Sequence, residues 1–132
     1  AMFRYLIFVG AALALGACAT ATGQHISVTG PDELVVRNER KKLAHINAPP
    51  ENCPVARNEA RIQLQQLRSK WGLDCQPEPN GEMWCNAGRA NVNAILVYAG
   101  LAFAEGDKFA EREQSARSIG AGMWGDMCPN VN

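Results

Sequence analysis

The stretch from residue 91 to residue 125 reads NVNAILVYAGLAFAEGDKFAEREQSARSIGAGMWG and carries the strongest structural signal in the chain. Its first part has apolar residues at helical spacing, which predicts a short helix over residues 91–99, capped by Asn91 and ended by Gly100. Its second part predicts a helix over Asp107–Ile119, stopped by glycines. The side chains from this stretch that we expect in the core are Val92, Ile95, Leu96, Ala99, Phe109, Ala116, Ile119 and Trp124.

A longer helix is predicted upstream, over residues 55–71. Pro54 suits the first turn of this helix and Gly72 suits its end. Apolar residues recur along it at steps of four, three and four, which forms a single stripe for burial. The stripe consists of Ala60, Leu64, Leu67 and Trp71.

Three short strands are predicted before that helix, over residues 25–29, 33–37 and 42–48. The segments between them, 30–32 and 38–40, have the composition of turns, so the strands should form an antiparallel meander. A hairpin is predicted after the helix. The chain therefore combines three strands, a helix, two strands and two helices, which indicates an α+β domain without a second unit.

The cysteines indicate an oxidising compartment. Pro79-Asn80-Gly81 is typical of a three-residue hairpin loop within residues 73–86, and this register places Cys75 opposite Cys85. A Cys75–Cys85 disulfide leaves Cys53–Cys128 by elimination. Four cysteines permit three pairings, so other connectivities remain open. A zinc site is disfavoured because no two of these cysteines are two residues apart.

The fifth cysteine is explained by the N-terminus. Residues 1–17 combine a basic residue, a short apolar run and the ending Leu-Gly-Ala before Cys18, which resembles a bacterial lipoprotein signal peptide. Residues 18–24 then form a lipidated tether, and residues 25–132 form the domain. Ala19 after the lipid cysteine resembles the sorting signal for the outer membrane, facing the periplasm. The alternative is a plain signal peptide with Cys18 incidental.

Charge and composition narrow the possible partners. The chain has 13 basic and 13 acidic residues, so no broad surface for nucleic acid or anionic membrane is indicated. The basic stretch Arg37–Lys42 is interpreted as a solvated hairpin turn, with a phosphate-tracking edge as the alternative. His25 and His45 lack a metal or triad spacing and are interpreted as structural or surface residues. Of the tryptophans, Trp84 is the one expected to be partly exposed.

Several motifs together resemble the staphylococcal nuclease-like (thermonuclease) domain family. The resemblance implies a five-stranded Greek-key β-barrel of the OB type with three helices packed against it. It covers about residues 25–125, with the motifs in the family's order. The matching pieces are Lys42–Glu51 (KLAHINAPPE), Val92-Asn93, Gly100-Leu101-Ala102, Glu113 with Ala116-Arg117, and Gly122-Met123-Trp124.

The resemblance also implies a site, and this site is degenerate. Active members use two arginines to hold phosphate, aspartates to bind calcium and a glutamate to assist the attacking water. Here the first arginine falls on Lys42, which keeps the charge but lacks the bidentate fork. One metal aspartate remains as Asp32. The replaced positions are Asn47 for the second aspartate, Pro50 for the glutamate, Asn80 for the second arginine and Glu78 for a base-stacking tyrosine.

Three substitutes would be needed together for metal-dependent hydrolysis: Glu51 for the glutamate, Arg89 for the arginine, and Asp32 with Glu33 as cation ligands. We therefore expect an envelope lipoprotein whose domain has lost catalysis and acts as a binding or structural module, without cofactor or metal. Its partner would be an envelope protein or a glycan rather than nucleic acid. The alternative is a weak or divergent secreted nuclease that uses Ca²⁺ with Asp32, Lys42 and Glu51.

Overall fold

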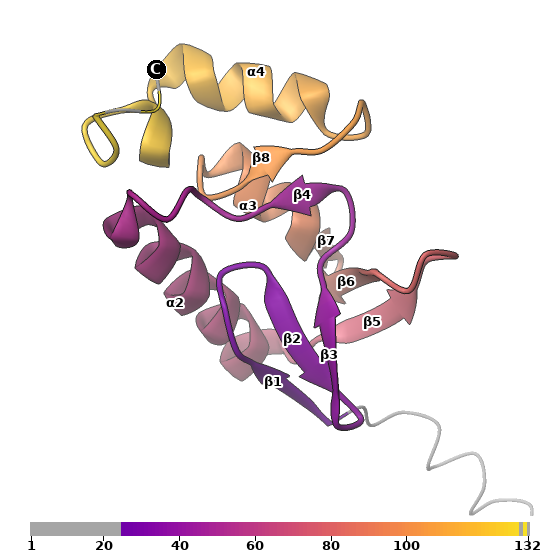
Figure 1. The fold of residues 1–132 in the computed structure, drawn as a ribbon. Coiled ribbons are helices and arrows are strands. Elements are labelled where there is room, and N and C mark those ends of the chain that lie inside the picture. Colours follow the sequence, from indigo (N-terminus) through magenta and orange to yellow (C-terminus); the bar gives the residue numbers. More distant parts are fainter. Residues whose placement is uncertain (1–24, 130, 132) are drawn as a thin grey trace, which may run out of the picture.

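A computed structural model describes residues 25–129 and 131 (Figure 1). These residues form an α+β domain in which three helices pack against three small antiparallel sheets. The predicted fold class and number of helices are thus confirmed. The predicted signal peptide, Cys18 and the predicted tether lie outside the described residues. Within the described part, no helix is both long and apolar enough to cross a bilayer.

The first sheet is the predicted meander, but its third strand is shifted. It has the order β1 (Ile26–Val28), β2 (Glu33–Val36) and β3 (Glu39–Lys42). The turn between β2 and β3 is only Arg37 and Asn38, with φ angles of 52° and 68°. Two consecutive positive φ angles are typical of a tight hairpin turn whose twist matches the strands. The turn predicted at 38–40 and the strand predicted at 42–48 were therefore wrong. The third strand begins at Glu39 because the charged residues Glu39–Lys42 already pair with Glu33–Val36.

The chain leaves this sheet at a sharp corner. After β3 the backbone turns at His45, whose φ is 65°, and then forms β4 (Ile46–Asn47). β4 pairs antiparallel with β8 (Phe103–Ala104) from the C-terminal part of the chain. The expected continuous strand is thus divided by a left-handed residue into two short strands that belong to different sheets.

The disulfide hairpin agrees with the sequence prediction. β5 (Asp74–Pro77) pairs with β6 (Met83–Ala87) in the register that sets Cys75 opposite Cys85, and β7 (Ala90–Asn91) extends this sheet. Both predicted disulfides are present, Cys75–Cys85 and Cys53–Cys128. The second bridge joins the start of a helix to the C-terminal segment.

That helix, α2 (Pro54–Trp71), has the predicted ends but not the whole predicted stripe. Ala60 and Leu64 are buried, as is Ala56 one turn earlier. Trp71 is 60% exposed, so its predicted burial was wrong. The reason is position: Trp71 is the last residue of the helix, and its ring lies over Gly88 in the β6–β7 turn rather than in the core.

The C-terminal helices are shorter than predicted. α3 (Val92–Tyr98) has the expected cap, because the Asn91 side chain accepts a hydrogen bond from the Ala94 N–H. α4 (Ala110–Ile119) begins three residues after the predicted Asp107, and Ile119 is 68% exposed instead of buried. Ala116 is the only residue of α4 that is buried. The 3₁₀ turn η2 (Gly122–Trp124) then buries Trp124, as predicted.

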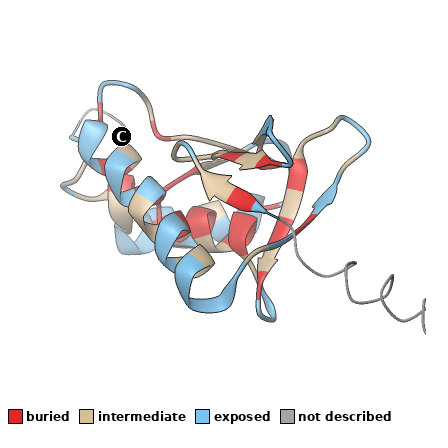
Figure 2. Cartoon of the chain, turned by 90° about the horizontal axis from the view of Figure 1, so that it is seen from below, coloured by how far each residue is buried: buried red, intermediate tan, exposed pale blue. Residues whose placement is uncertain are grey.

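The interior lies between the helices and the sheets, as the buried residues in Figure 2 show. The first sheet and the disulfide hairpin meet at one parallel bridge, between Leu43 and Met83. There the Ala44 N–H donates to the Met83 carbonyl over 2.8 Å. Among the described strands no closed barrel forms, since the corner at His45 ends the contact after this bridge. The predicted five-stranded barrel is therefore not confirmed, and the described strands form three separate small sheets.

One buried side chain stabilises the contact between the first sheet and the disulfide hairpin. The Asn93 amide on α3 is fully buried. Its nitrogen donates to the Ala44 carbonyl at 2.8 Å and to the Met83 carbonyl at 3.0 Å. Its oxygen accepts from the Cys85 N–H at 3.2 Å. A fully satisfied amide of this kind specifies one relative placement of helix and strands.

Candidate functional site

Polar side chains from four parts of the chain gather on the corner formed by residues 42–48. We call this group the corner cluster. Asp32 comes from the turn before β2, Glu78 and Glu82 come from the β5–β6 turn, and Glu105 follows β8. The members of the corner cluster are Asp32, Lys42, His45, Glu78, Glu82 and Glu105.

Asp32 holds the far end of the corner. One of its carboxylate oxygens accepts a hydrogen bond from the Ala48 N–H at 3.1 Å. Its own backbone carbonyl accepts from the Leu43 N–H at 2.8 Å. Both bonds fix the corner relative to the β1–β2 turn, so this carboxylate already performs a structural task.

Lys42 lies at the centre of the cluster. Its ammonium donates to the backbone carbonyls of Leu43, at 3.2 Å, and Ile46. It also lies 3.8 Å from a Glu82 carboxylate oxygen and 4.0 Å from one of Glu105. An ammonium has three N–H donors. Two of them bind backbone carbonyls, and the two carboxylates lie at ion-pair distance. The positive charge of Lys42 is therefore paired with acidic groups of the same chain.

His45 connects the corner to an aromatic group. Its Nε2 lies 2.7 Å from a Glu78 carboxylate oxygen, and its ring meets Trp84 and Phe109 edge-on at centroid distances of 6.2 and 6.3 Å. Trp84 stacks on Phe109 at 5.7 Å, and the Lys108 ammonium lies 4.9 Å from the Trp84 ring centre. Trp84 is half-buried, but these contacts use much of its ring.

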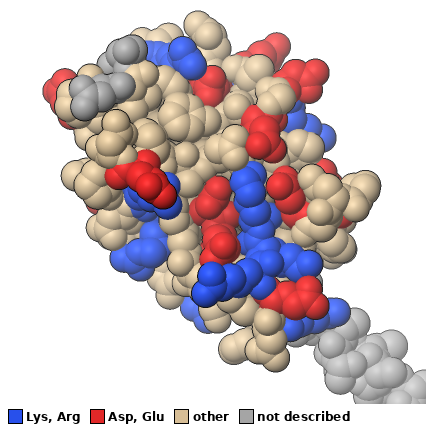
Figure 3. Space-filling model, viewed as in Figure 1, with Lys and Arg blue, Asp and Glu red and all other residues tan. Residues whose placement is uncertain are grey.

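The balance of charge in the cluster is negative. Four carboxylates stand against one ammonium, which gives a formal charge of −3 with His45 neutral. On the face that carries β3 and β4, Figure 3 shows acidic side chains interleaved with basic ones rather than a continuous basic surface. The cluster therefore carries an excess of negative charge.

The remaining positions implied by the resemblance do not join this cluster as a catalytic set. Glu51 is exposed on the turn before α2 and makes no hydrogen bond or ion pair within the described residues. Glu33 accepts a hydrogen bond from the Thr29 hydroxyl at 3.0 Å, in the β1–β2 turn. Arg89 is exposed in the turn between β6 and β7. Asp32 and Lys42 are thus brought to one corner, and Glu33 lies opposite Lys42 in the β2–β3 ladder while its carboxylate bonds Thr29. Within the described residues, Glu51 and Arg89 form no hydrogen bond or ion pair with the corner cluster.

The replaced positions have structural contacts. Asn47 pairs with Phe103 in the β4–β8 ladder. The Pro50 carbonyl accepts from the Cys53 N–H at 3.0 Å. The Asn80 side chain accepts from the Glu82 N–H at 2.9 Å and so shapes the hairpin turn. Within the part of the chain described, no group of three or more histidine, cysteine, aspartate or glutamate side chains is arranged to hold a metal ion.

The sequence interpretation missed two members of the cluster, Glu82 and Glu105. Each is a single acidic residue in a turn, with no pattern that distinguishes it from a solvated charge. The hairpin register gives one signal for Glu82, because residue 82 must face residue 78 in the turn. No such signal exists for Glu105, which reaches Lys42 only through the pairing of β8 with β4.

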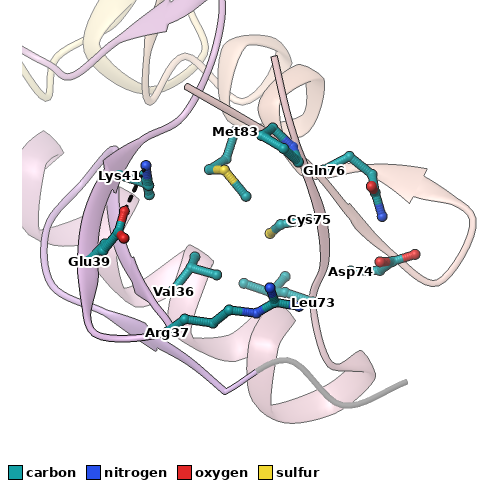
Figure 4. A pocket seen from close by; sticks show the side chains of 10 residues that line it. Val36, Arg37, Glu39, Lys41, Leu73, Asp74, Cys75, Gln76 and Met83 are labelled. Atoms are coloured by element: carbon teal, nitrogen blue, oxygen red, sulfur yellow. Dashed lines mark ion pairs between the residues drawn. The ribbon is translucent and has the colours of Figure 1, made fainter. Parts of the chain in front are cut away.

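A groove of about 850 Å³ lies beside the cluster, between β3 and the disulfide hairpin (Figure 4). Val36, Leu73 and Met83 provide its apolar surface. Its rim is charged, and the Lys41 ammonium pairs with Glu39 there at 3.1 Å. The groove is the space left where the two sheets diverge after the Leu43–Met83 bridge.

Neither a protein-family model nor a curated protein matches the sequence.

Proposed function

We propose that this chain is a bacterial envelope lipoprotein whose thermonuclease-like domain has lost hydrolysis and serves as a binding or structural module. Its partner is an envelope protein or a glycan. The observation that carries the proposal is the state of Lys42, whose ammonium bonds two carbonyls and lies beside two carboxylates.

The chemistry of phosphodiester hydrolysis explains why this observation matters. The pentavalent transition state requires positive charge aimed at its oxygens, and that charge must be free to bind phosphate. Lys42 is the cation at the position implied for the first phosphate arginine, yet two of its three N–H donors already bind backbone carbonyls and two carboxylates lie beside it. The other side chains that contact the corner, Asp32 and Glu78 among them, add negative charge.

The order of the strands supports a relation to OB-type barrels. β1, β2 and β3 form a meander, the end of β3 meets β6 in parallel, and β6 pairs antiparallel with β5. This is the sequence of neighbours along an OB-type sheet, with the parallel contact reduced to one bridge. In this proposal the degenerate member keeps the strand order but not full closure.

The cysteines support the proposed location. Two disulfides require an oxidising compartment, which the periplasm provides. Lipid on Cys18 would anchor the domain to the outer membrane through the tether 18–24. Intact-mass measurement of the membrane-extracted protein tests this part. A diacylated or triacylated mature chain beginning at Cys18 is expected, whereas an unmodified Cys18 would remove the anchor from the proposal.

A cleavage assay tests the loss of hydrolysis. Purified domain is incubated with a fluorogenic single-stranded DNA in calcium and, in parallel, in chelator. We expect the same background rate in both conditions, and an unchanged rate for the Asp32→Ala variant. Calcium-dependent turnover that disappears in Asp32→Ala would establish the alternative, a divergent calcium-dependent nuclease.

A further inference from the structure

The surroundings of the Lys42 ammonium have the composition of a cation site. Two carbonyl oxygens, of Leu43 and Ile46, bind it directly. Two carboxylate oxygens, of Glu82 and Glu105, lie at 3.8 and 4.0 Å. All four partners are oxygen atoms, and they surround one nitrogen from the corner, the hairpin turn and the segment after β8.

The backbone that carries each of these oxygens is fixed by local structure. The carbonyls of Leu43 and Ile46 point to the same nitrogen across the left-handed residue His45. Glu82 is fixed in its turn by the bond from its N–H to Asn80 at 2.9 Å. The Glu105 N–H donates to the His45 carbonyl at 2.9 Å, which anchors that residue at the corner as well. The arrangement therefore depends only partly on Lys42 itself.

An ammonium and a hard metal cation require similar partners. Ca²⁺ is bound by carboxylates and backbone carbonyls at about 2.3–2.6 Å, in flexible geometry, with waters completing a set of 6–8 oxygens. Two carboxylates would balance its two charges. The Lys42 side chain is 31% exposed and that of Glu105 is 50% exposed, which leaves space for waters and for a short inward movement of the carboxylate.

We propose that these four oxygens form a cation site that the Lys42 ammonium permanently occupies. The lysine acts as a tethered counter-ion, and its removal would make the site available to a divalent hard cation such as Ca²⁺. Because the ammonium is attached to the chain beside its own ligands, free cations in solution compete with it poorly. The inference is independent of the proposed function, since it concerns binding and not hydrolysis.

The test is calcium binding by a Lys42→Met variant, measured by titration calorimetry and by thermal unfolding in increasing CaCl₂. Methionine keeps an unbranched stem of similar length and removes the charge. We expect a dissociation constant on the order of 10⁻⁴–10⁻³ M, as in extracellular calcium modules. The wild type should give no binding heat and no calcium-dependent shift in Tm.

Lys41→Met is the matched control, because Lys41 is the neighbouring lysine on β3 and, among the residues that the structure describes, pairs only with Glu39. This variant should behave like the wild type. Adding Glu82→Gln and Glu105→Gln to Lys42→Met should weaken calcium binding at least tenfold. Equal calcium binding by Lys41→Met and Lys42→Met would show a nonspecific charge effect and overturn the proposal.

Loss of folding in the variant does not prevent the test. Lys42→Gln, which retains an N–H donor for one carbonyl, is measured in parallel. If one variant is folded, absence of a calcium signal at 10 mM, on the order of ten times the weakest expected constant, overturns the proposal. If both are unfolded, recovery of the native circular dichroism spectrum in calcium supports it, and no recovery overturns it.

Discussion

Replacement of Asn93 by alanine should be among the most damaging single changes in this domain. Asn93 is the buried amide that joins α3 to both sides of the parallel bridge, with bonds to Ala44, Met83 and Cys85 of 2.8, 3.0 and 3.2 Å. Alanine keeps the helix but removes all three bonds. The loss of stability should therefore reflect the three lost hydrogen bonds and not a change in helix propensity.

The magnitude follows from the groups left behind. The Met83 carbonyl retains its bond from the Ala44 N–H, so the Ala44 carbonyl and the Cys85 N–H are the groups that lose most. A buried polar group without its partner costs about 1–3 kcal/mol, so two such groups cost about 2–6 kcal/mol. We expect a loss of about 4 kcal/mol in the free energy of unfolding. This is a large part of a typical stability of about 5–15 kcal/mol.

The assay is urea unfolding followed by circular dichroism, with Asn91→Ala as the matched control. Asn91 is two residues earlier, half-buried, and caps α3, so its replacement should cost about 1–2 kcal/mol. A loss for Asn93→Ala no larger than that of Asn91→Ala would refute the reasoning. Asn93→Asp should also be destabilised near pH 7, because a carboxylate oxygen would face two carbonyls.

Three further outcomes use the same urea assay. Removing the Cys53–Cys128 bridge as a double alanine variant should cost about 4.5 kcal/mol and removing Cys75–Cys85 about 2.7 kcal/mol, because they span 75 and 10 residues; the reverse order would contradict the entropic account. Gly100→Ala should cost well over about 3 kcal/mol, since its Cβ would lie 2.0 Å from a backbone oxygen. Gly106 also has a positive φ but has nothing within 4 Å of an added Cβ, so Gly106→Ala should cost only about 1–2 kcal/mol. Equal losses of stability for Gly100→Ala and Gly106→Ala would contradict the steric explanation. Trp71→Ala should cost less than about 1 kcal/mol because the side chain is exposed, and a loss above 2 kcal/mol, that of a buried residue, would disprove it.

The helices and the hairpin were predictable because their signals are local. Pro54 and Gly72 mark the ends of α2, and Asn91 caps α3, where the sequence places them. The Cys75–Cys85 register follows from counting outward from the loop. The errors arose at Trp71 and Ile119, since periodicity gives the face of a helix but not how far the neighbouring sheet extends along it.

The corner cluster was only partly predictable. The motif containing Lys42 located the corner, and the hairpin placed Glu82 in its turn. The meeting of Lys42 with Glu105 depends on the pairing of β4 with β8, between residues more than fifty positions apart. Long-range pairing of this kind leaves no periodic trace in a single sequence.

The sequence by itself determined the α+β class, the ends of α2, the cap of α3, the hairpin register and the cysteines available for bridging, because caps, turns and periodicity act over a few residues. The tertiary structure decided that the sheets stay separate after one bridge, that Asn93 fastens them, and that the Lys42 ammonium is surrounded by oxygens. Those outcomes depend on the left-handed turn at His45 and on contacts between distant segments. The contacts that stabilise these features form only when distant segments come together in the folded chain.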